Sequence, residues 1–169
     1  MIEMRVMGIA LDTRTGSPIV VLHDKDNRKA LPIWIGSAEA SAIIRKIENL
    51  QVVRPMTHDL IIDVIQKTGY KLEKAEINDV EKDTYFATLI LTKEGEENVE
   101  IDCRPSDAIA VAIRVDAPIY VAASVLATGA VSTDPSKDEE EAQEFKSFVQ
   151  NLKPSDFEKL LKGHEESDQ

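Results

Sequence analysis

The chain of 169 residues has the length of one compact domain with a short extension, and 43% apolar residues are enough to form a buried core. No stretch approaches the roughly 18 uninterrupted apolar residues of a membrane-spanning helix. The acidic start, Met1 to Met4, lacks the basic and then apolar order of a secretory signal. A single cysteine excludes an internal disulfide and any zinc site built from several cysteines. These features favour a soluble, cytoplasmic protein with no membrane partner.

Acidic residues outnumber basic ones, 31 to 20, and the net charge of −11 gives a field that repels nucleic acid and anionic membranes. The excess is concentrated late in the chain: residues 1–124 hold 15 basic and 20 acidic residues, whereas the much shorter 125–169 hold 5 and 11. Any role with nucleic acid must therefore depend on local basic groups or on bound metal, and not on a broad positive surface.

The first part of the chain alternates short β-type runs with a helical pattern. Arg5–Leu11 and Ile19–His23 flank the turn-rich segment Asp12–Pro18, which predicts a hairpin. A third run, Ala30–Ile35, leads into apolar residues at helical spacing over Ala40–Ile47. The predicted order is strand, strand, strand, helix.

A second helix is predicted over Thr57–Gly69, with Thr57 suited to cap its N-terminus and Gly69 suited to end it. Its expected buried face consists of Leu60, Ile61, Val64 and Ile65. The opening order then returns as three strand-like runs, a helix and a closing strand: Leu72–Asp79, Tyr85–Thr92, Asn98–Cys103, Asp107–Val115 and Pro118–Ala122.

A shift of 68 residues aligns the two halves of this pattern without a gap. It pairs Ile33 with Ile101, and Glu39 with Asp107 at the start of each predicted helix. Because strand, turn and helix signals match in one register, the sequence predicts a duplicated β-β-β-α unit. The expected class is therefore α+β: a mixed sheet with helices packed on it and an approximate twofold axis between the halves.

The end of the chain differs in composition from the rest. We expect a domain over residues 1–126, an acidic linker over 127–141 and a helical extension over 142–169. The extension places Phe145, Phe148, Val149 and Leu152 on one helical face, and Phe157, Leu160 and Leu161 on a second. Apolar faces of this kind need cover, which predicts a homo-oligomer.

Familiar catalytic strings are absent, since there is no glycine-rich phosphate loop, no His-Glu-x-x-His and no Gly-x-Ser-x-Gly. Cys103 lies on an apolar run and is expected to be a core residue, not a nucleophile. The segment Arg54–Asp59 places His58 and Asp59 in the first turn of a predicted helix, where the helix dipole favours a neutral imidazole that can bind metal or accept a proton. The alternative is that Thr57 and Asp59 cap the helix while His58 fills a polar niche.

A second polar segment, Asp102–Asp107, lies where a strand meets a helix that would begin at Pro105. The backbone amides of such a junction and the forked donor of Arg104 suit phosphate oxygens, while Asp102 and Asp107 suit a divalent cation. The alternative is that Asp107 only stabilises the first helical turn, as Glu39 would in the first half.

At three blocks the sequence resembles the bifunctional nuclease domain family: Leu31–Gly36, Arg54–Leu60 and Arg104–Ala110. The resemblance covers roughly Met4 to Leu126. It implies a compact α+β domain that associates into oligomers, and some members of the family are described as cleaving both DNA and RNA. The expected activity is thus a nuclease of little sequence specificity.

The resemblance further implies hydrolysis of phosphodiester bonds with Mg²⁺ or Mn²⁺ held by carboxylates. The catalytic candidates are His58, Asp59 and Asp107. The substrate-binding candidates are Arg54, Arg104 and Ser106, and the metal-ligand candidates are Asp59, Asp102 and Asp107.

These two segments are expected to meet in one polar pocket, although both could be independent helix caps. The net charge predicts that binding of nucleic acid is weak and salt-sensitive. The alternative function is a non-catalytic oligomeric module that binds an anion or a partner protein.

Overall fold

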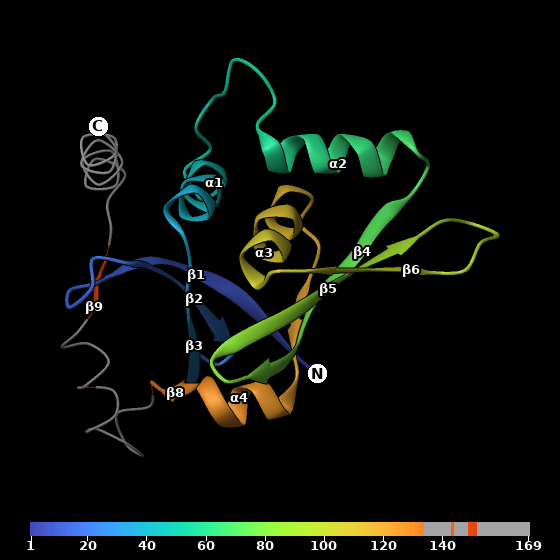
Figure 1. The fold of residues 1–169 in the computed structure, drawn as a ribbon. Helices are drawn as coiled ribbons and strands as arrows, with labels where there is room; N and C mark the ends of the chain where they lie inside the picture. The colour runs from blue at the N-terminus through green and yellow to red at the C-terminus, as the bar shows by residue number, and fades with distance from the viewer. Residues whose placement is uncertain (134–142, 144–148, 152–169) are drawn as a thin grey trace.

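The strands of the protein form one curved mixed sheet, with α1, α2 and α3 above it and α4 at its lower end in the view of Figure 1. The computed structural model describes residues 1–133, 143 and 149–151. The strands are β1 Ile2–Asp12, β2 Pro18–Asp24, β3 Lys29–Trp34, β4 Lys71–Glu81, β5 Thr84–Thr92, β6 Val99–Cys103, β7 Ile119–Val121, β8 Val131–Ser132 and β9 Val149–Asn151. The helices are α1 Ser37–Ile47, α2 Thr57–Lys67, α3 Pro105–Arg114 and α4 Ala123–Gly129.

The sheet has the topology of a duplicated unit. Its strand order is β6-β5-β4-β7-β1-β2-β3-β8, with β9 added to β1. On one side of β7 the strands follow in the order β1, β2, β3, and on the other side they follow in the equivalent order β4, β5, β6. Because β7 is antiparallel to β1 and parallel to β4, the strands β1 and β4 run in opposite directions, as a twofold axis normal to the sheet requires. The predicted α+β class and the repeated β-β-β-α order are confirmed.

The helices α1 and α3 are equivalent elements of the two halves and pack against each other. Glu39 and Asp107 are each the third residue of their helix, as the shift of 68 predicts. Alanines are buried in both helices at equivalent positions, Ala40 and Ala42 in α1 and Ala108 and Ala110 in α3. Side chains this small let two helix backbones approach closely. The starts of both helices are therefore held close to each other.

The helix α2 begins one residue earlier than predicted. Met56 occupies the cap position, so Thr57 is the first helical residue and does not cap the helix. Instead, the Asp59 carboxylate accepts the backbone N–H of Met56 at 2.9 Å. At the other end Gly69 has φ 86°, and its N–H bonds to the Gln66 carbonyl at 3.0 Å. The prediction that Gly69 ends the helix is confirmed, because this left-handed conformation suits glycine.

The predicted buried face of α2 is wrong in part. Ile62 and Ile65 are buried, but Leu60 is 57% exposed and Val64 is 55% exposed. Apolar residues cover most of the circumference of this helix, so their spacing alone does not choose a buried side. The face that carries His58, Ile62 and Ile65 is the one that packs onto the core.

The described chain continues past the expected domain end at residue 126. The unpredicted helix α4 runs to Gly129, and β8 follows it and pairs with β3. The strand β9 pairs with β1, so the helix expected across Val149–Asn151 is wrong there, since these residues take extended backbone. The remaining residues of the two expected apolar faces, Phe145, Phe148, Leu152, Phe157, Leu160 and Leu161, lie outside the described residues. In the part of the chain that is described, no helix combines the length and the apolar character needed to cross a bilayer.

Candidate functional site

The two polar segments meet through a hydrogen bond between His58 and Asp107. The imidazole Nε2 lies 2.9 Å from Asp107 Oδ1, although the two residues are 49 positions apart in the chain. His58 belongs to the first turn of α2, and Asp107 to the first turn of α3. The predicted convergence of the segments is confirmed for this pair.

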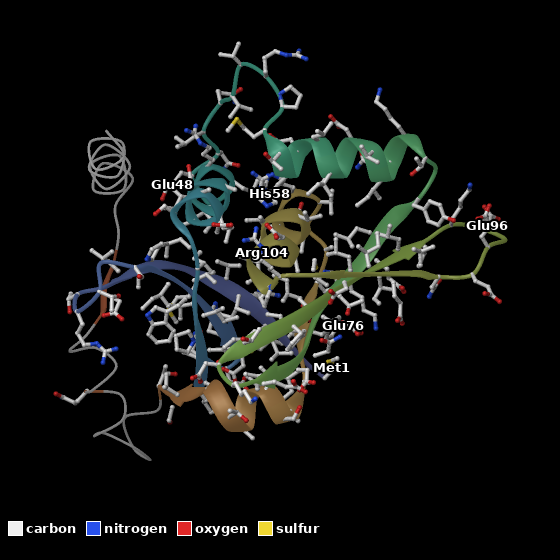
Figure 2. The ribbon with its side chains drawn as sticks, in the orientation of Figure 1. Met1, Glu48, His58, Glu76, Glu96 and Arg104 are labelled. Atoms are coloured by element: carbon white, nitrogen blue, oxygen red, sulfur yellow. The ribbon has the colours of Figure 1, made fainter. Side chains whose placement is uncertain are left out.

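Arg104 joins this pair to the first half of the molecule. Its Nε and Nη2 donate to Asp107 at 2.7 and 3.1 Å, and its Nη1 lies 2.7 Å from Glu39 Oε1. Arg104 is the cap residue of α3, and Glu39 is in the first turn of α1. The starts of three helices therefore supply one connected cluster of four side chains, the His58–Asp107–Arg104–Glu39 cluster. Figure 2 shows His58 and Arg104 between α1, α2 and α3.

The cluster is protected on one side and open on the other. The side chain of His58 is 10% exposed and that of Glu39 is 14% exposed, whereas the side chain of Arg104 is 65% exposed. A ligand that approaches from solvent thus meets the guanidinium first. An exposed guanidinium beside a mostly buried imidazole suits recognition of an anionic group next to a proton acceptor.

The charges of the cluster favour an ionised Asp107. Burial by itself would raise the pKa of this carboxyl, but the hydrogen bonds from Arg104 and His58 outweigh burial and hold the pKa below its usual value. A carboxylate only accepts hydrogen bonds, so Nε2 of His58 is the nitrogen that carries the proton. Its Nδ1 makes no hydrogen bond within the described chain, and in the neutral form of the ring it carries a lone pair.

The carboxylate of Asp59 bonds to Arg114 and not to a residue of the second polar segment, Asp102–Asp107. Its Oδ1 accepts a hydrogen bond from Arg114 Nε at 2.8 Å, while Arg114 also donates to the carbonyls of Ala110 and Ala42. Burial acts to raise the pKa of Asp59, and the bonds from Met56 and Arg114 lower it below the ordinary value. Ala42 and Ala110 are equivalent in the two halves, so Arg114 ties α1, α2 and α3 together where the repeats meet.

Three other predicted site residues do not join the cluster. Arg54 is exposed between α1 and α2 and makes no hydrogen bond or ion pair with the described residues. Ser106 is only 6% exposed, so it is shielded from a substrate. Asp102 is exposed on β6, and it points away from the face on which its neighbour Cys103 packs, because successive side chains of a strand alternate.

The carboxylates do not form the expected metal site. Among the described residues, no group of three or more His, Cys, Asp or Glu side chains is placed to hold a metal ion. Asp59 and Asp107 each accept bonds from a different arginine, and Asp102 lies apart from both. The residues present therefore do not fit a preformed Mg²⁺ or Mn²⁺ site built from Asp59, Asp102 and Asp107.

Cys103 is close to the cluster but poorly suited to act as a nucleophile. Burial raises the pKa of its thiol to about 11, with a further contribution from the negative charges of Asp107 and Asp102. The side chain packs against the hydrophobic core, as expected. At neutral pH almost none of it is the reactive thiolate.

Glu39 and Arg114 were missed as site residues. The signal for Glu39 is its alignment with Asp107, which equally fits a carboxylate that only stabilises the first turn of its helix. The signal for Arg114 was weaker, because a cation in the last turn of a helix is ordinary helix chemistry. Only the docking of α2 onto α3 gives Arg114 its carboxylate partner.

A comparison with protein families matches residues 20–134 of the chain to the bifunctional nuclease domain. A protein of Mycobacterium tuberculosis H37Rv, named only as uncharacterized, is 37% identical over 163 residues, which cover 92% of this chain and 97% of the relative. Bifunctional nuclease 2 of Oryza sativa subsp. japonica is 33% identical over 124 residues, 71% of this chain and 38% of the plant protein.

Bifunctional nuclease 2 of Arabidopsis thaliana is 32% identical over 107 residues, which cover 62% of this chain and 32% of the plant protein. The chain thus matches about a third of each plant protein, and nearly the whole of the mycobacterial one. The family match covers more than half of the chain and includes all four residues of the His58–Asp107–Arg104–Glu39 cluster. The chain belongs to the bifunctional nuclease domain family.

Proposed function

We propose that the protein hydrolyses phosphodiester bonds in DNA or RNA at the His58–Asp107–Arg104–Glu39 cluster. The observation that carries the proposal is the orientation of His58, whose Nε2 donates to Asp107 while its Nδ1 has no hydrogen-bond partner among the described residues. Membership of a family with plant members named bifunctional nucleases supports the choice of substrate.

His58 would act as the general base. Its Nδ1 takes a proton from the attacking water, the water oxygen forms a bond to phosphorus, and the bond from phosphorus to the leaving sugar oxygen breaks. The leaving sugar oxygen takes up a proton from solvent water, and the imidazolium returns its own proton to the solvent. Asp107 keeps the ring in one tautomer and stabilises its positive charge, as a carboxylate partner does for histidine bases in general.

Arg104 would bind the phosphate undergoing attack. The guanidinium can turn one of its forked donors from a carboxylate to phosphate oxygens because its side chain is 65% exposed. In the transition state these oxygens gain negative charge, and a fixed guanidinium stabilises that charge more than it stabilises the ground state. Glu39 holds Arg104 from the other side and acts as a positioning residue.

Binding of substrate is proposed to be weak and salt-sensitive. The chain carries a net charge of −11, so association with a polyanion relies on a few local cations. Mg²⁺ or Mn²⁺ would lower the repulsion between the protein and its substrate. No catalytic step above uses a metal ion, because the described carboxylates do not form a ligand set.

The proposal is tested with His58→Gln and, as a matched control, His23→Gln. His23 lies on β2, where its Nδ1 contacts the backbone carbonyl of the next residue, and it has no part in the cluster. End-labelled single-stranded DNA and RNA are incubated with each variant in Mg²⁺, in Mn²⁺ and in EDTA. We expect His58→Gln to lower cleavage about 10²–10⁴-fold, the usual contribution of a general base, and His23→Gln to cleave as the native chain does.

Equal cleavage by the native chain and His58→Gln would show that the imidazole is not the base. No cleavage by the native chain in any buffer would favour the non-catalytic binding module. Activity lost in EDTA and restored by Mn²⁺ would make a divalent ion part of the reaction.

We also propose that the protein is a homo-oligomer. Exposed apolar side chains follow one another on the α1–α2 connection and the outer side of α2. They are Leu50, Val52, Val53, Met56, Leu60 and Val64. An exposed apolar patch of this kind on a protein surface favours association with another copy of the chain. Multi-angle light scattering of the native chain and of Leu60→Glu tests this: a monomeric mass for both at micromolar concentration would contradict the proposal.

A further inference from the structure

A second polar feature lies between the end of α1 and the start of α2. It is a pocket of about 190 Å³, and its polar lining comes from Arg45, Lys46, Asn49, Gln51, Asp59 and Arg114. Asp59 follows His58 directly in the chain, so the pocket and the proposed catalytic cluster use the same first turn of α2. None of the four cluster residues lines the pocket.

The pocket has a positive local charge in a strongly acidic protein. Three cations, Arg45, Lys46 and Arg114, line it against one carboxylate, Asp59. That carboxylate is already bonded to Arg114 at 2.8 Å. Arg45 and Lys46 make no ion pair with any described residue, so their charges are available to an anion.

Arg45 also carries an unused donor. Its Nε is the one buried side-chain nitrogen or oxygen, among those of the described residues, that has no hydrogen-bond partner. A buried N–H without a partner is unfavourable, and such groups in native proteins are usually satisfied by a bound water, ion or ligand. The charge of the guanidinium favours a negatively charged acceptor.

We infer that this pocket binds one phosphate group of a nucleic-acid strand, next to the bond that the cluster cleaves. The inference rests on the proposed nuclease function and adds a substrate-binding subsite to it. At about 190 Å³ the pocket is smaller than the roughly 300–1,000 Å³ of sites that enclose whole small molecules. It therefore suits a single group of a longer chain, whose neighbouring parts remain in solvent.

The residue types fit a phosphate group well. A guanidinium and an ammonium can bind separate oxygens of one phosphate, and the side-chain amides of Asn49 and Gln51 supply neutral donors. None of these contacts reads a base, so the subsite positions the backbone without sequence preference. Arg54, a predicted substrate-binding residue, does not line this pocket, whereas Arg45 and Lys46 do.

The test compares Arg45→Gln and Lys46→Gln with the control Lys67→Gln. Lys67 lies in the last turn of α2, is exposed and makes no ion pair, so its loss changes the net charge equally without touching the pocket. Binding of a fluorescein-labelled single-stranded DNA is measured by anisotropy over a salt series, in full-length protein that carries His58→Gln to prevent cleavage. Inorganic phosphate is titrated separately as the second probe.

We expect Arg45→Gln to weaken DNA binding about tenfold, the usual effect of one charge-assisted hydrogen bond. The slope of log affinity against log salt should fall by about 0.7, as for one phosphate contact on a single strand. Lys67→Gln should change neither quantity by more than about twofold. In the His58→Gln protein, the NMR signal of the Arg45 Nε–H group should shift on addition of the DNA, which reports on the pocket without any substitution in it.

Equal DNA affinity for Arg45→Gln and Lys67→Gln, with an unmoved Arg45 signal, would overturn the inference. Binding of inorganic phosphate alone, without an Arg45-dependent effect on DNA, would also overturn the assignment to a strand and identify a site for free phosphate. A failure of the nuclease proposal gives a different result. The native chain would then cleave no oligonucleotide, while Arg45→Gln would still weaken the binding of DNA.

Discussion

Replacement of Asp107 by Asn tests the link between the fold and the proposed chemistry. In the native protein this carboxylate accepts two bonds from Arg104, at 2.7 and 3.1 Å, and one from His58 at 2.9 Å. Asparagine has a similar shape, but it has no charge and only one acceptor oxygen. The His58 ring would lose both its fixed tautomer and the negative charge beside it.

The stability cost follows from the exposure of each partner. The side chain of Arg104 is 65% exposed, so its two bonds behave as a surface ion pair and contribute about 0.5–1 kcal/mol together. The His58 side chain is 10% exposed, and its bond contributes about 1–1.5 kcal/mol. We therefore expect Asp107→Asn to lower the free energy of unfolding by about 2 kcal/mol. In a chain of this size that corresponds to a fall in Tm of about 4–8 °C.

The pH dependence has a definite sign. Because the pKa of Asp107 is lowered in the folded protein, its ionised form stabilises the fold above the unfolded pKa of about 3.9. That stabilisation is lost as the pH falls through the lower, folded pKa. The part of the difference in unfolding free energy between the native chain and Asp107→Asn that comes from the ionisation of Asp107 should thus be fully present above about pH 5 and shrink under more acidic conditions.

Urea unfolding and oligonucleotide cleavage are measured on Asp107→Asn, on Glu39→Gln and on Asp107→Asn combined with His58→Gln. Glu39 shares Arg104 but does not touch His58, so Glu39→Gln should keep more of the activity. Cleavage by Asp107→Asn should fall about 10²–10⁴-fold, and adding His58→Gln should lower it little further, because the two residues act as a unit. Full activity in Asp107→Asn with the expected loss of stability would refute the catalytic role and leave Asp107 as a helix-stabilising residue.

Three further predictions address the surrounding structure. Arg114→Ala should lower the free energy of unfolding by about 3 kcal/mol, because Arg114 is 8% exposed and its loss removes the partner of Asp59 Oδ1 and one hydrogen bond to each of two backbone carbonyls. A loss below about 1 kcal/mol in urea unfolding would contradict this. Gly69→Ala should lower the free energy of unfolding by about 1 kcal/mol, because a side chain is strained at the φ of 86°. The control is Gly8→Ala, whose added Cβ meets open space. Equal urea midpoints for Gly69→Ala and the native chain would show that a side chain does not strain the left-handed turn. Cys103 should react slowly with iodoacetamide at pH 8, because burial raises the pKa of its thiol to about 11. The reaction rate should rise about tenfold per pH unit until the pH nears that pKa. A rate that levels off near pH 8.5 would contradict this and indicate an ordinary, exposed thiol.

Sequence periodicity predicted most of the elements because the signals are local. The turn over Asp12–Pro18, the helix start at Pro105 and the helix end at Gly69 depend on backbone preferences of a few residues, and all three are found in the structure. The alignment of Glu39 with Asp107 likewise predicted the duplicated architecture. It did so because repeated order along the chain needs no knowledge of how the repeats dock.

Tertiary structure alone decided which polar residues meet. His58 and Asp59 are neighbours in sequence, yet successive helical residues face different directions, so one contacts Asp107 and the other contacts Arg114. Which partner each one finds depends on how α2 docks onto α3, and the apolar residues of α2 are too widely spread around the helix to fix that side. The buried alanines of α1 and α3 then set how near the starts of those helices lie, and this closeness lets Arg104 reach both Glu39 and Asp107.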